Sequence, residues 1–120
     1  MAKAKVLLVD DDGVFINNLG AYLEIMKYDV TKVGTGETAL ELIEKNKPDF
    51  LLVDLKLPDM DGRAIVKKTK EISPNTVIFV VSAYVDLETE ERVKQVGARS
   101  LIYKPVMFDD VVELLKKAKP

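Results

Sequence analysis

Four short groups of reactive side chains stand directly after apolar runs of strand length in this chain. The groups are Asp10-Asp11-Asp12, Asp54, Ser82 and Lys104-Pro105. Because strand ends of one polarity lie along one edge of a parallel sheet, these residues are expected to meet there. Carboxylates at close range raise each other's pKa, so their cluster favours a hard, oxygen-seeking cation such as Mg²⁺. With a hydroxyl and an ammonium beside them, the carboxylates predict a Mg²⁺-dependent site that accepts a phosphoryl group.

The elements that must position these groups follow from the apolar pattern, which alternates strand-like runs with amphipathic stretches. Strands are predicted over 6–9, 30–33, 50–53, 77–81 and 101–103. Helices are predicted between and after them, over about 15–26, 37–45, 63–71, 86–96 and 108–118. The first helix is expected to place on one face Phe15, Leu19, Tyr22, Leu23 and Met26. The first, third and fourth strands are continuously apolar, as in parallel strands covered on both faces, which predicts an open, doubly wound α/β sandwich.

The composition excludes several kinds of chemistry. The 120 residues contain no Cys and no His, which removes disulfides, thiolate catalysis, the usual general base and the usual transition-metal ligands. The net charge of −2, with both signs interspersed, offers no basic footprint for direct nucleic-acid binding. No apolar stretch approaches the roughly 20 residues of a membrane span, and residues 1–5 do not resemble a signal peptide. We therefore expect one cytoplasmic domain over residues 1–120, without direct nucleic-acid or membrane binding.

The three consecutive acids after the first strand exceed what a helix N-cap needs. We assign Asp12 mainly to the cap, Asp11 to metal binding and Asp10 to support of the site. An EF-hand is excluded, because its loop needs alternating ligands, a Gly at the sixth position and a Glu at the twelfth.

Asp54 directly follows a strand that is predicted to be buried, so its carboxylate is expected at the sheet edge. A carboxylate can attack a phosphoryl group and form an acyl phosphate. Asp59 and Asp61, in the loop that follows, are predicted to be solvated loop acids. The aspartyl-phosphate site of haloacid dehalogenases does not fit, because it needs a second Asp two residues on, where this chain has Lys56.

Ser82 and Lys104 are weak signals when each is taken singly, because such residues are usually caps, turns or solvated charges. On neighbouring strand ends, however, they supply a hydrogen-bond donor and a compact cation for phosphoryl oxygens. Pro105 removes an amide and restrains the backbone of Lys104.

The ordered motifs resemble response-regulator receiver domains of two-component signalling, from Lys5 to Lys117. The matching features are Val9-Asp10-Asp11, Asp54, Pro58-Asp59-Met60-Asp61-Gly62, Ser82-Ala83 and Lys104-Pro105. The resemblance implies a flavodoxin-like fold, with strand order 2-1-3-4-5 and helices on both faces of the sheet. It also implies a phosphoacceptor that is served by the phosphohistidine of a sensor histidine kinase or histidine phosphotransfer protein.

The resemblance implies the following acceptor and metal site. Asp54 is the phosphoacceptor. Asp11, Asp54 and the backbone carbonyl of Lys56 ligate Mg²⁺, with Mn²⁺ as an alternative ion, and Asp10 acts through water. Such a domain is a signalling switch that catalyses only its own phosphorylation and dephosphorylation, and not a metabolic enzyme.

The resemblance also implies a switch. Ser82 contacts the phosphoryl group after transfer, Lys104 pairs with it, and the Lys104-Pro105 bond is cis. In this family an aromatic residue three positions before the Lys follows the hydroxyl inward, and here that position is Leu101. The departure predicts a muted rearrangement of the face made by the fourth helix, fifth strand and fifth helix, where a downstream protein is expected to bind. Tyr103 lies on the side of Leu101 only if the strand is regular.

Two further positions flank the acceptor, namely Lys56, two residues after Asp54, and Tyr84, two residues after Ser82. In receiver domains these positions tune the access of the hydrolytic water. A bulky Tyr84 ring is expected to shield the phosphoryl group and to give a long-lived phosphoaspartate. The Lys/Tyr pair is similar to that of sporulation-type single-domain phosphorelay intermediates.

Two rival hypotheses use other features of the chain. Residues 34–39 match G-x-G-x-x-A before a predicted helix, as in a dinucleotide site. However, the motif follows the second strand and not the first, and the chain is too short for both halves of such a fold. The second rival, a degenerate receiver that serves only as an interaction module, ranks below a working phosphoacceptor because all four chemical positions are filled. The sequence leaves open a stand-alone chain or a piece of a larger regulator or hybrid kinase, and a monomer or a phosphorylation-dependent dimer.

Overall fold

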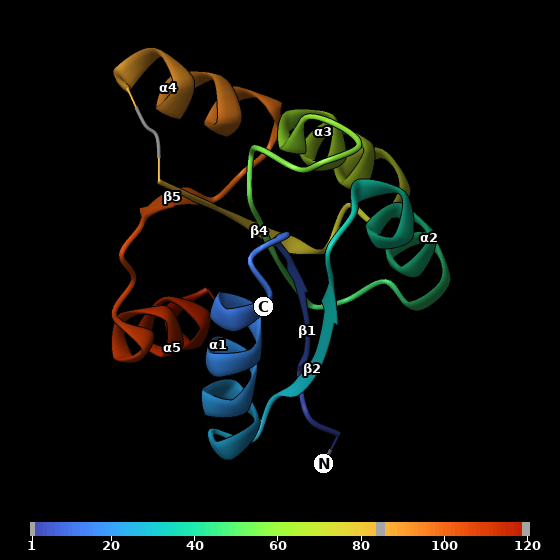
Figure 1. Cartoon of the computed structure of the whole chain (residues 1–120). Helices are drawn as coiled ribbons and strands as arrows, with labels where there is room; N and C mark the ends of the chain where they lie inside the picture. The colour runs from blue at the N-terminus through green and yellow to red at the C-terminus, as the bar shows by residue number, and fades with distance from the viewer. Residues whose placement is uncertain (1, 84–85, 119–120) are drawn as a thin grey trace.

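The computed structural model describes residues 2–83 and 86–118 (Figure 1). Its strands are β1 (Lys5–Val9), β2 (Asp29–Val33), β3 (Phe50–Val53), β4 (Val77–Ser82) and β5 (Ser100–Tyr103). Its helices are α1 (Gly13–Ile25), α2 (Gly36–Asn46), α3 (Gly62–Ile72), α4 (Leu87–Val96) and α5 (Phe108–Lys117). The strands pair in parallel in the order β2-β1-β3-β4-β5, which confirms the predicted flavodoxin-like, doubly wound fold. None of the described helices is long and apolar enough to cross a membrane.

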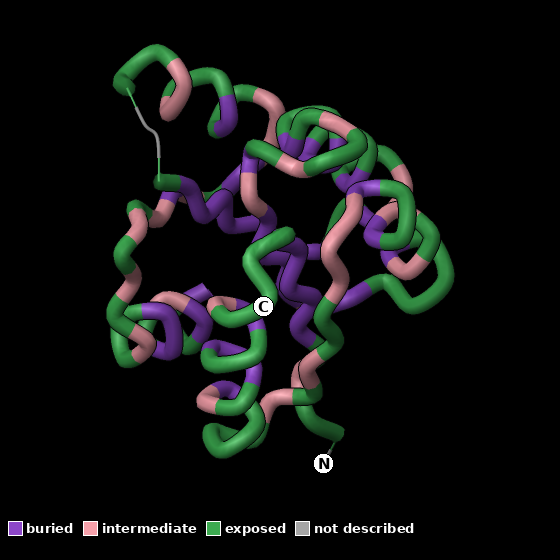
Figure 2. Tube along the Cα trace, in the orientation of Figure 1, coloured by how far each residue is buried: buried purple, intermediate pink, exposed green. Residues whose placement is uncertain are grey.

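Helices cover both faces of the sheet, with α1 and α5 on one face and α2, α3 and α4 on the other (Figure 1). Successive residues of β1 alternate between the two resulting cores, so that Val6 and Leu8 pack in one and Leu7 and Val9 in the other. The central strands are buried along their length (Figure 2), whereas the edge strand β2 is half-buried or exposed. Burial on both faces is the physical reason for the continuous apolar runs of the central strands.

The buried face of α1 is rotated from the predicted one. Ile16, Leu19 and Leu23 are buried, whereas Phe15 is half-buried and Met26 is exposed beyond the end of the helix. The prediction of an inward Met26 was therefore wrong. The half-buried edge of α1 instead packs against α5, where the Phe15 and Phe108 rings lie 6.5 Å apart.

Carboxylates cap the amino ends of three helices. Asp12 accepts from the amide of Phe15 at 3.1 Å and caps α1, as predicted. Asp61 caps α3 through the amide of Arg63 at 2.8 Å, and its carboxylate also pairs with the Arg63 guanidinium at 2.7 Å. Asp61 is exposed, as expected of a loop acid, but it also starts a helix. Asp86 caps α4 in the same way.

Candidate functional site

The predicted groups meet at the carboxyl edge of the sheet. β1 ends just before Asp10 and β3 just before Asp54, whereas Ser82 closes β4. The parallel register places Val9 beside Val53, Val53 beside Val80, and Ser82 beside Tyr103, which precedes Lys104. The sheet thus gathers side chains that are up to 94 residues apart in the sequence.

Three carboxylates converge within this edge. One oxygen from each of Asp10, Asp11 and Asp54 lies within 4.8 Å of the other two. The side chains of Asp10 and Asp54 are only 4% and 12% exposed. Burial, and then the charge of Asp10, raise the pKa of Asp54, although Lys104 and the amides of Lys56 and Leu55 act in the opposite direction. Asp11 is exposed, so the cluster opens to solvent on one side, and its crowded oxygen donors with excess negative charge fit a hard divalent cation.

Lys104 brings a positive charge to these carboxylates. Its Nζ donates to an Asp10 carboxylate oxygen at 2.7 Å and lies 3.6 Å from an oxygen of Asp54. It also lies 4.8 Å from the centroid of the Phe15 ring. Burial acts to lower the pKa of Lys104, but the hydrogen bond and charge of Asp10, followed by the charge of Asp54, raise it overall. The ammonium is therefore held charged beside the candidate acceptor.

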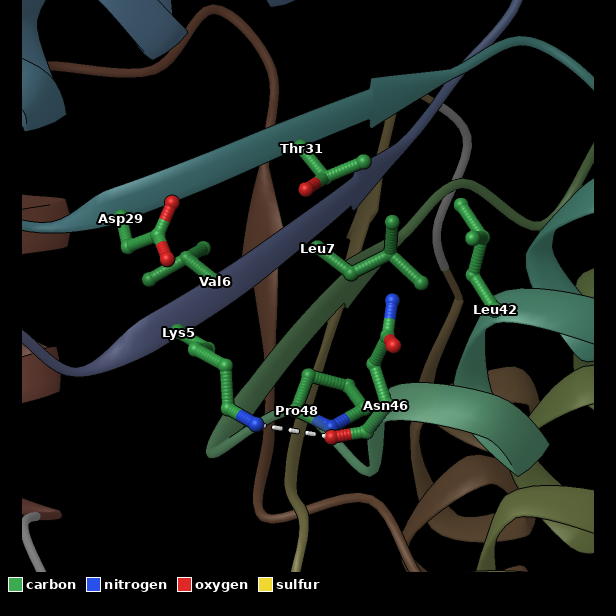
Figure 3. Close-up of a pocket in the computed structure, with 8 residues that line it drawn as sticks. All are labelled: Lys5, Val6, Leu7, Asp29, Thr31, Leu42, Asn46 and Pro48. Carbon is green, nitrogen blue, oxygen red and sulfur yellow. Dashed lines mark hydrogen bonds between the residues drawn. The ribbon is translucent and has the colours of Figure 1, made fainter.

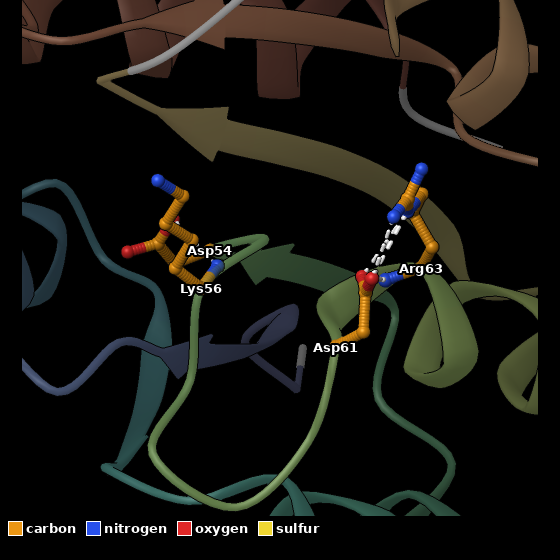
Figure 4. A network of polar contacts seen from close by, with 4 residues as sticks. All are labelled: Asp54, Lys56, Asp61 and Arg63. Carbon is orange, nitrogen blue, oxygen red and sulfur yellow. Dashed lines mark hydrogen bonds and ion pairs between the residues drawn. The ribbon is translucent and has the colours of Figure 1, made fainter.

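The remaining predicted residues surround this centre. Ser82 is buried, and its carbonyl accepts from the amide of Lys104 at 3.0 Å. The Lys104-Pro105 bond is cis, as the resemblance implied. Lys56 is exposed, and its amide donates to Asp54 at 3.4 Å. Figure 4 shows the Lys56 side chain near Asp54 and apart from the Asp61–Arg63 pair. Tyr84 lies outside the described residues.

The β5 positions of the predicted switch both face α4. Leu101 is buried in the same core as Val93 of α4, whereas Ile102 packs in the opposite core. Tyr103 is 51% exposed, and its hydroxyl donates to Glu90 of α4 at 3.0 Å. The strand is therefore regular, and an aromatic side chain does contact α4 from β5, two positions beyond the one expected.

Asp59 joins the acceptor loop to α2, a contact that the sequence analysis missed. Its two carboxylate oxygens accept from the amides of Gly36 and Glu37 at 2.8 and 2.9 Å. A Cβ at position 36 would lie 2.2 Å from the sulfur of Met60, so this Gly is explained by packing. Because a helix amino end would have to receive the phosphates of a dinucleotide, a carboxylate already bound there argues against the dinucleotide hypothesis. The run of residues from Pro58 to Gly62 marked this loop in the sequence, but nothing in the sequence showed that Asp59 contacts α2.

Asp59→Asn is expected to lower the urea midpoint of unfolding at pH 7. The amides of Gly36 and then Glu37 lower the pKa of Asp59 in the folded protein. The stabilisation is therefore present above the unfolded pKa, about 3.9, and is lost as the pH falls through the lower folded value. The difference between wild type and variant should begin to shrink near pH 4 and close only at lower pH, below the folded pKa. Glu44→Gln, an exposed change on α2, is the control; an equal effect of the two changes would contradict the capping role.

Comparison with known proteins finds response regulator receiver domains by both sequence and structure. The family model described as response regulator receiver domain matches residues 6–116. The chain is 32% identical over 120 residues to sporulation initiation phosphotransferase F of Bacillus subtilis, spanning 100% of this chain and 97% of that protein. A CheY-like response regulator receiver domain protein from Methanospirillum hungatei superimposes with a TM-score of 0.93 at 31% identity, covering 96% of this chain and 92% of that one.

Other relatives are much longer than this chain. The chain is 41% identical over 104 residues to a cyclic di-GMP phosphodiesterase of Thermotoga maritima. The matched region covers 87% of this chain but only 28% of that protein. The activity in that name therefore belongs to a protein of which this chain matches about a quarter.

Proposed function

Because the chain belongs to the response regulator receiver domain family, we propose that Asp54 is its phosphoacceptor in two-component signalling. The donor is the phosphohistidine of a sensor histidine kinase or histidine phosphotransfer protein, since this chain has no His. The observation that carries the proposal is the position of Asp54. Its largely buried carboxylate lies 3.6 Å from the Lys104 ammonium and within 4.8 Å of two other carboxylates.

Transfer is a displacement at phosphorus. An Asp54 oxygen forms the new O–P bond, the P–N bond of the donor breaks, and its electron pair returns to the imidazole, which takes up a proton. Lys104 and the Ser82 hydroxyl then serve as donors to the phosphoryl oxygens. Because Lys104 is bound to Asp10 in the unphosphorylated protein, accepting the phosphoryl group includes a change of partner for this ammonium.

The metal part of the proposal concerns the acidic cluster. Asp11, Asp54 and the carbonyl of Lys56 would hold Mg²⁺ or Mn²⁺ directly, and Asp10 would do so through water. The bound ion supplies neutralisation of the charge on the phosphoryl oxygens. The crowding of carboxylate oxygens supports this assignment, as does the pKa of Asp54, which is raised by burial and then by the charge of Asp10.

The whole chain is proposed to act as a cytoplasmic switch and not as a metabolic enzyme. Residues 1–120 form one receiver domain that catalyses only its own phosphorylation and slow dephosphorylation. Output passes to a downstream protein through the face of α4, β5 and α5, from a monomer or a phosphorylation-dependent dimer, with no direct binding of nucleic acid or membrane. Shielding by Tyr84 would lengthen the life of the phosphoaspartate, and an unchanged dephosphorylation rate in Tyr84→Ala would contradict that role.

The first experiment measures the intact mass of the protein after incubation with acetyl phosphate, with either Mg²⁺ or EDTA. We expect one phosphoryl adduct with Mg²⁺ and none with EDTA. A parallel sample with beryllofluoride, whose complex does not depend on survival of an acyl phosphate, controls for hydrolysis during handling. If the protein formed no adduct and also failed to bind beryllofluoride, the degenerate interaction module would be favoured.

Phe15→Leu is expected to slow adduct formation roughly two- to five-fold, the equivalent of about 0.5–1 kcal/mol for a cation–π contact. The Phe15 ring lies 4.8 Å from Lys104 Nζ and packs against Phe108 of α5, so it positions the ammonium from one side. Phe15→Tyr keeps the ring and should keep the rate. If both variants were equally slow, the ring would not act through Lys104.

Phosphorylation is expected to produce a muted rearrangement of the α4, β5 and α5 face, because Leu101 stands where the family has its mobile aromatic residue. Leu101 is already buried, and Tyr103 is held to Glu90 by its hydroxyl. Amide chemical shifts recorded with and without beryllofluoride should therefore change mainly around Asp54. A large cooperative change over the whole face would contradict this, and Tyr103→Phe would then show whether the bond to Glu90 carries it.

A further inference from the structure

A basic pocket lies at the amino-terminal ends of β4 and β5, at the opposite end of the strands from Asp54. Its volume is about 500 Å³. Four cations from four different segments line it, namely Lys70 of α3, Lys94 of α4, Arg99 before β5 and Lys117 of α5. No Asp or Glu is among the described residues that line this basic pocket. In a chain whose net charge is −2, this concentration of positive charge is unusual.

Most of these cations are not neutralised by carboxylates. Lys94 pairs with Glu90 at 3.3 Å, in a partly exposed contact that is worth little in water. Within residues 2–83 and 86–118, Lys70, Arg99 and Lys117 make no ion pair. Three full charges therefore face the basic pocket without a counter-charge from a side chain.

The stem of the Lys70 side chain packs against the backbone at Gly97. A Cβ at Gly97 would lie 2.3 Å from Cγ of Lys70 and 2.9 Å from its Cε, so the lysine stem lies across the glycine. Gly97 also has a φ of +127°, which disfavours a side chain there. The basic pocket thus includes a cation whose stem is restricted on one side by this contact, which reduces the freedom that it loses on binding a ligand.

Helix ends account for only part of this charge. Lys70, Lys94 and Lys117 lie in the last turns of α3, α4 and α5, where cations interact favourably with the helix dipole. Each helix end supplies roughly half a negative charge. Three ends give about −1.5 against the four positive side chains, and Glu90 offsets Lys94, so an excess of about +1.5 remains. Arg99 lies in no helix and has no such role.

A neighbouring hollow at the same edge of the sheet shows the contrast. It lies between β1, β2 and α2 (Figure 3) and contains both Lys5 and Asp29. The Nζ of Lys5 there already donates to the carbonyl of Asn46 at 2.8 Å. That hollow therefore has neither the excess charge nor the uncommitted cations of the basic pocket.

We propose that the basic pocket binds a small multivalent anion that carries phosphate groups. A volume of about 500 Å³ lies within the usual range for small-molecule sites. The guanidinium of Arg99 offers a planar fork that matches two phosphate oxygens, and the lysines supply point charges around it. The site is distinct from the phosphoacceptor, and its ligand binds whether or not Asp54 is phosphorylated.

The test is a titration with sodium tripolyphosphate in EDTA at low ionic strength, followed by melting temperature and amide chemical shifts. We expect a rising melting temperature and shifts confined to the residues that line the basic pocket, namely 70, 74–78, 94, 97–99 and 117–118. The double variant Arg99→Gln/Lys70→Gln should weaken binding at least about ten-fold, through the loss of two phosphate contacts. Lys45→Gln/Lys67→Gln removes the same charge from exposed positions outside the pocket and should bind as wild type does.

Each other outcome would overturn the proposal. Equal weakening in the two double variants would show only a general charge effect, and shifts at residues 10–12 and 54 would place the anion elsewhere. Citrate should bind more weakly than tripolyphosphate, and equal binding would contradict the phosphate class. Asp54→Asn should bind as wild type does, so the result stands apart from the outcome of the phosphorylation experiment.

Discussion

Asp54→Asn is expected to abolish the phosphoryl adduct that forms with acetyl phosphate and Mg²⁺. The amide has nearly the shape of the carboxylate but lacks its nucleophilic charge. Asp10 is the other largely buried carboxylate of the site, but its oxygens already accept from Lys104 at 2.7 Å and from the amide of Asp12 at 2.9 Å, whereas Asp54 lies farther from the ammonium, at 3.6 Å. Intact mass measures the loss, and Asp59→Asn, in the loop that follows, should keep the adduct. An adduct on Asp54→Asn would move the acceptor to another residue.

The same change is expected to raise the melting temperature of the metal-free protein. Burial and the charge of Asp10 raise the pKa of Asp54 despite its proximity to Lys104, so the folded state disfavours the ionised form at pH 7. A neutral amide removes both the buried charge and its repulsion by Asp10, and we expect the melting temperature in EDTA to rise by about a few degrees. The wild-type carboxylate would then lower the stability of the fold while providing the acceptor function, a trade-off that is common at functional sites. A lower melting temperature would mean that the contact with Lys104 outweighs the crowding.

Gly62→Ala is expected to damage both the fold and the acceptor. A Cβ at position 62 would lie 2.2 Å from the carbonyl oxygen of Asp54 and 2.8 Å from Cα of Leu55. These are backbone atoms that cannot rotate away, and the amide of Gly62 is bonded to the carbonyl of Leu55 at 2.8 Å. The loop must therefore shift, at a cost of about 1–3 kcal/mol or more in the free energy of unfolding. Because the shift displaces Asp54 itself, adduct formation should also slow.

Gly13→Ala is the matched control for this effect. Gly13 is likewise the first residue of a helix beside the site, but no atom lies within 4 Å of the Cβ that it would gain. Urea unfolding and the rate of adduct formation should therefore change little in this variant. If the two alanine variants behaved alike, the close approach at Gly62 would not be what holds the acceptor loop.

The sequence by itself determined the fold class and the chemical groups of the site. Continuous apolar runs such as 50–53 and 77–81 require strands that are covered on both faces, and this pattern is local enough to be seen along the chain. Asp54 and Ser82 stand at the ends of such runs, so parallel pairing alone brings them to one edge. The absence of His and Cys restricted the chemistry to carboxylate, hydroxyl and ammonium groups.

Only the tertiary structure decided which side chains contact one another across that edge. Lys104 binds Asp10 across 94 residues, and Asp59 in the loop after β3 accepts from the first amide of α2. Tyr103 donates to Glu90 because α4 packs against the face of the sheet on which the Tyr103 side chain lies. The basic pocket also needs the ends of α3, α4 and α5 to converge. Periodicity reports which face of an element is buried, but contacts between distant elements depend on how the layers pack, and no local pattern contains that information.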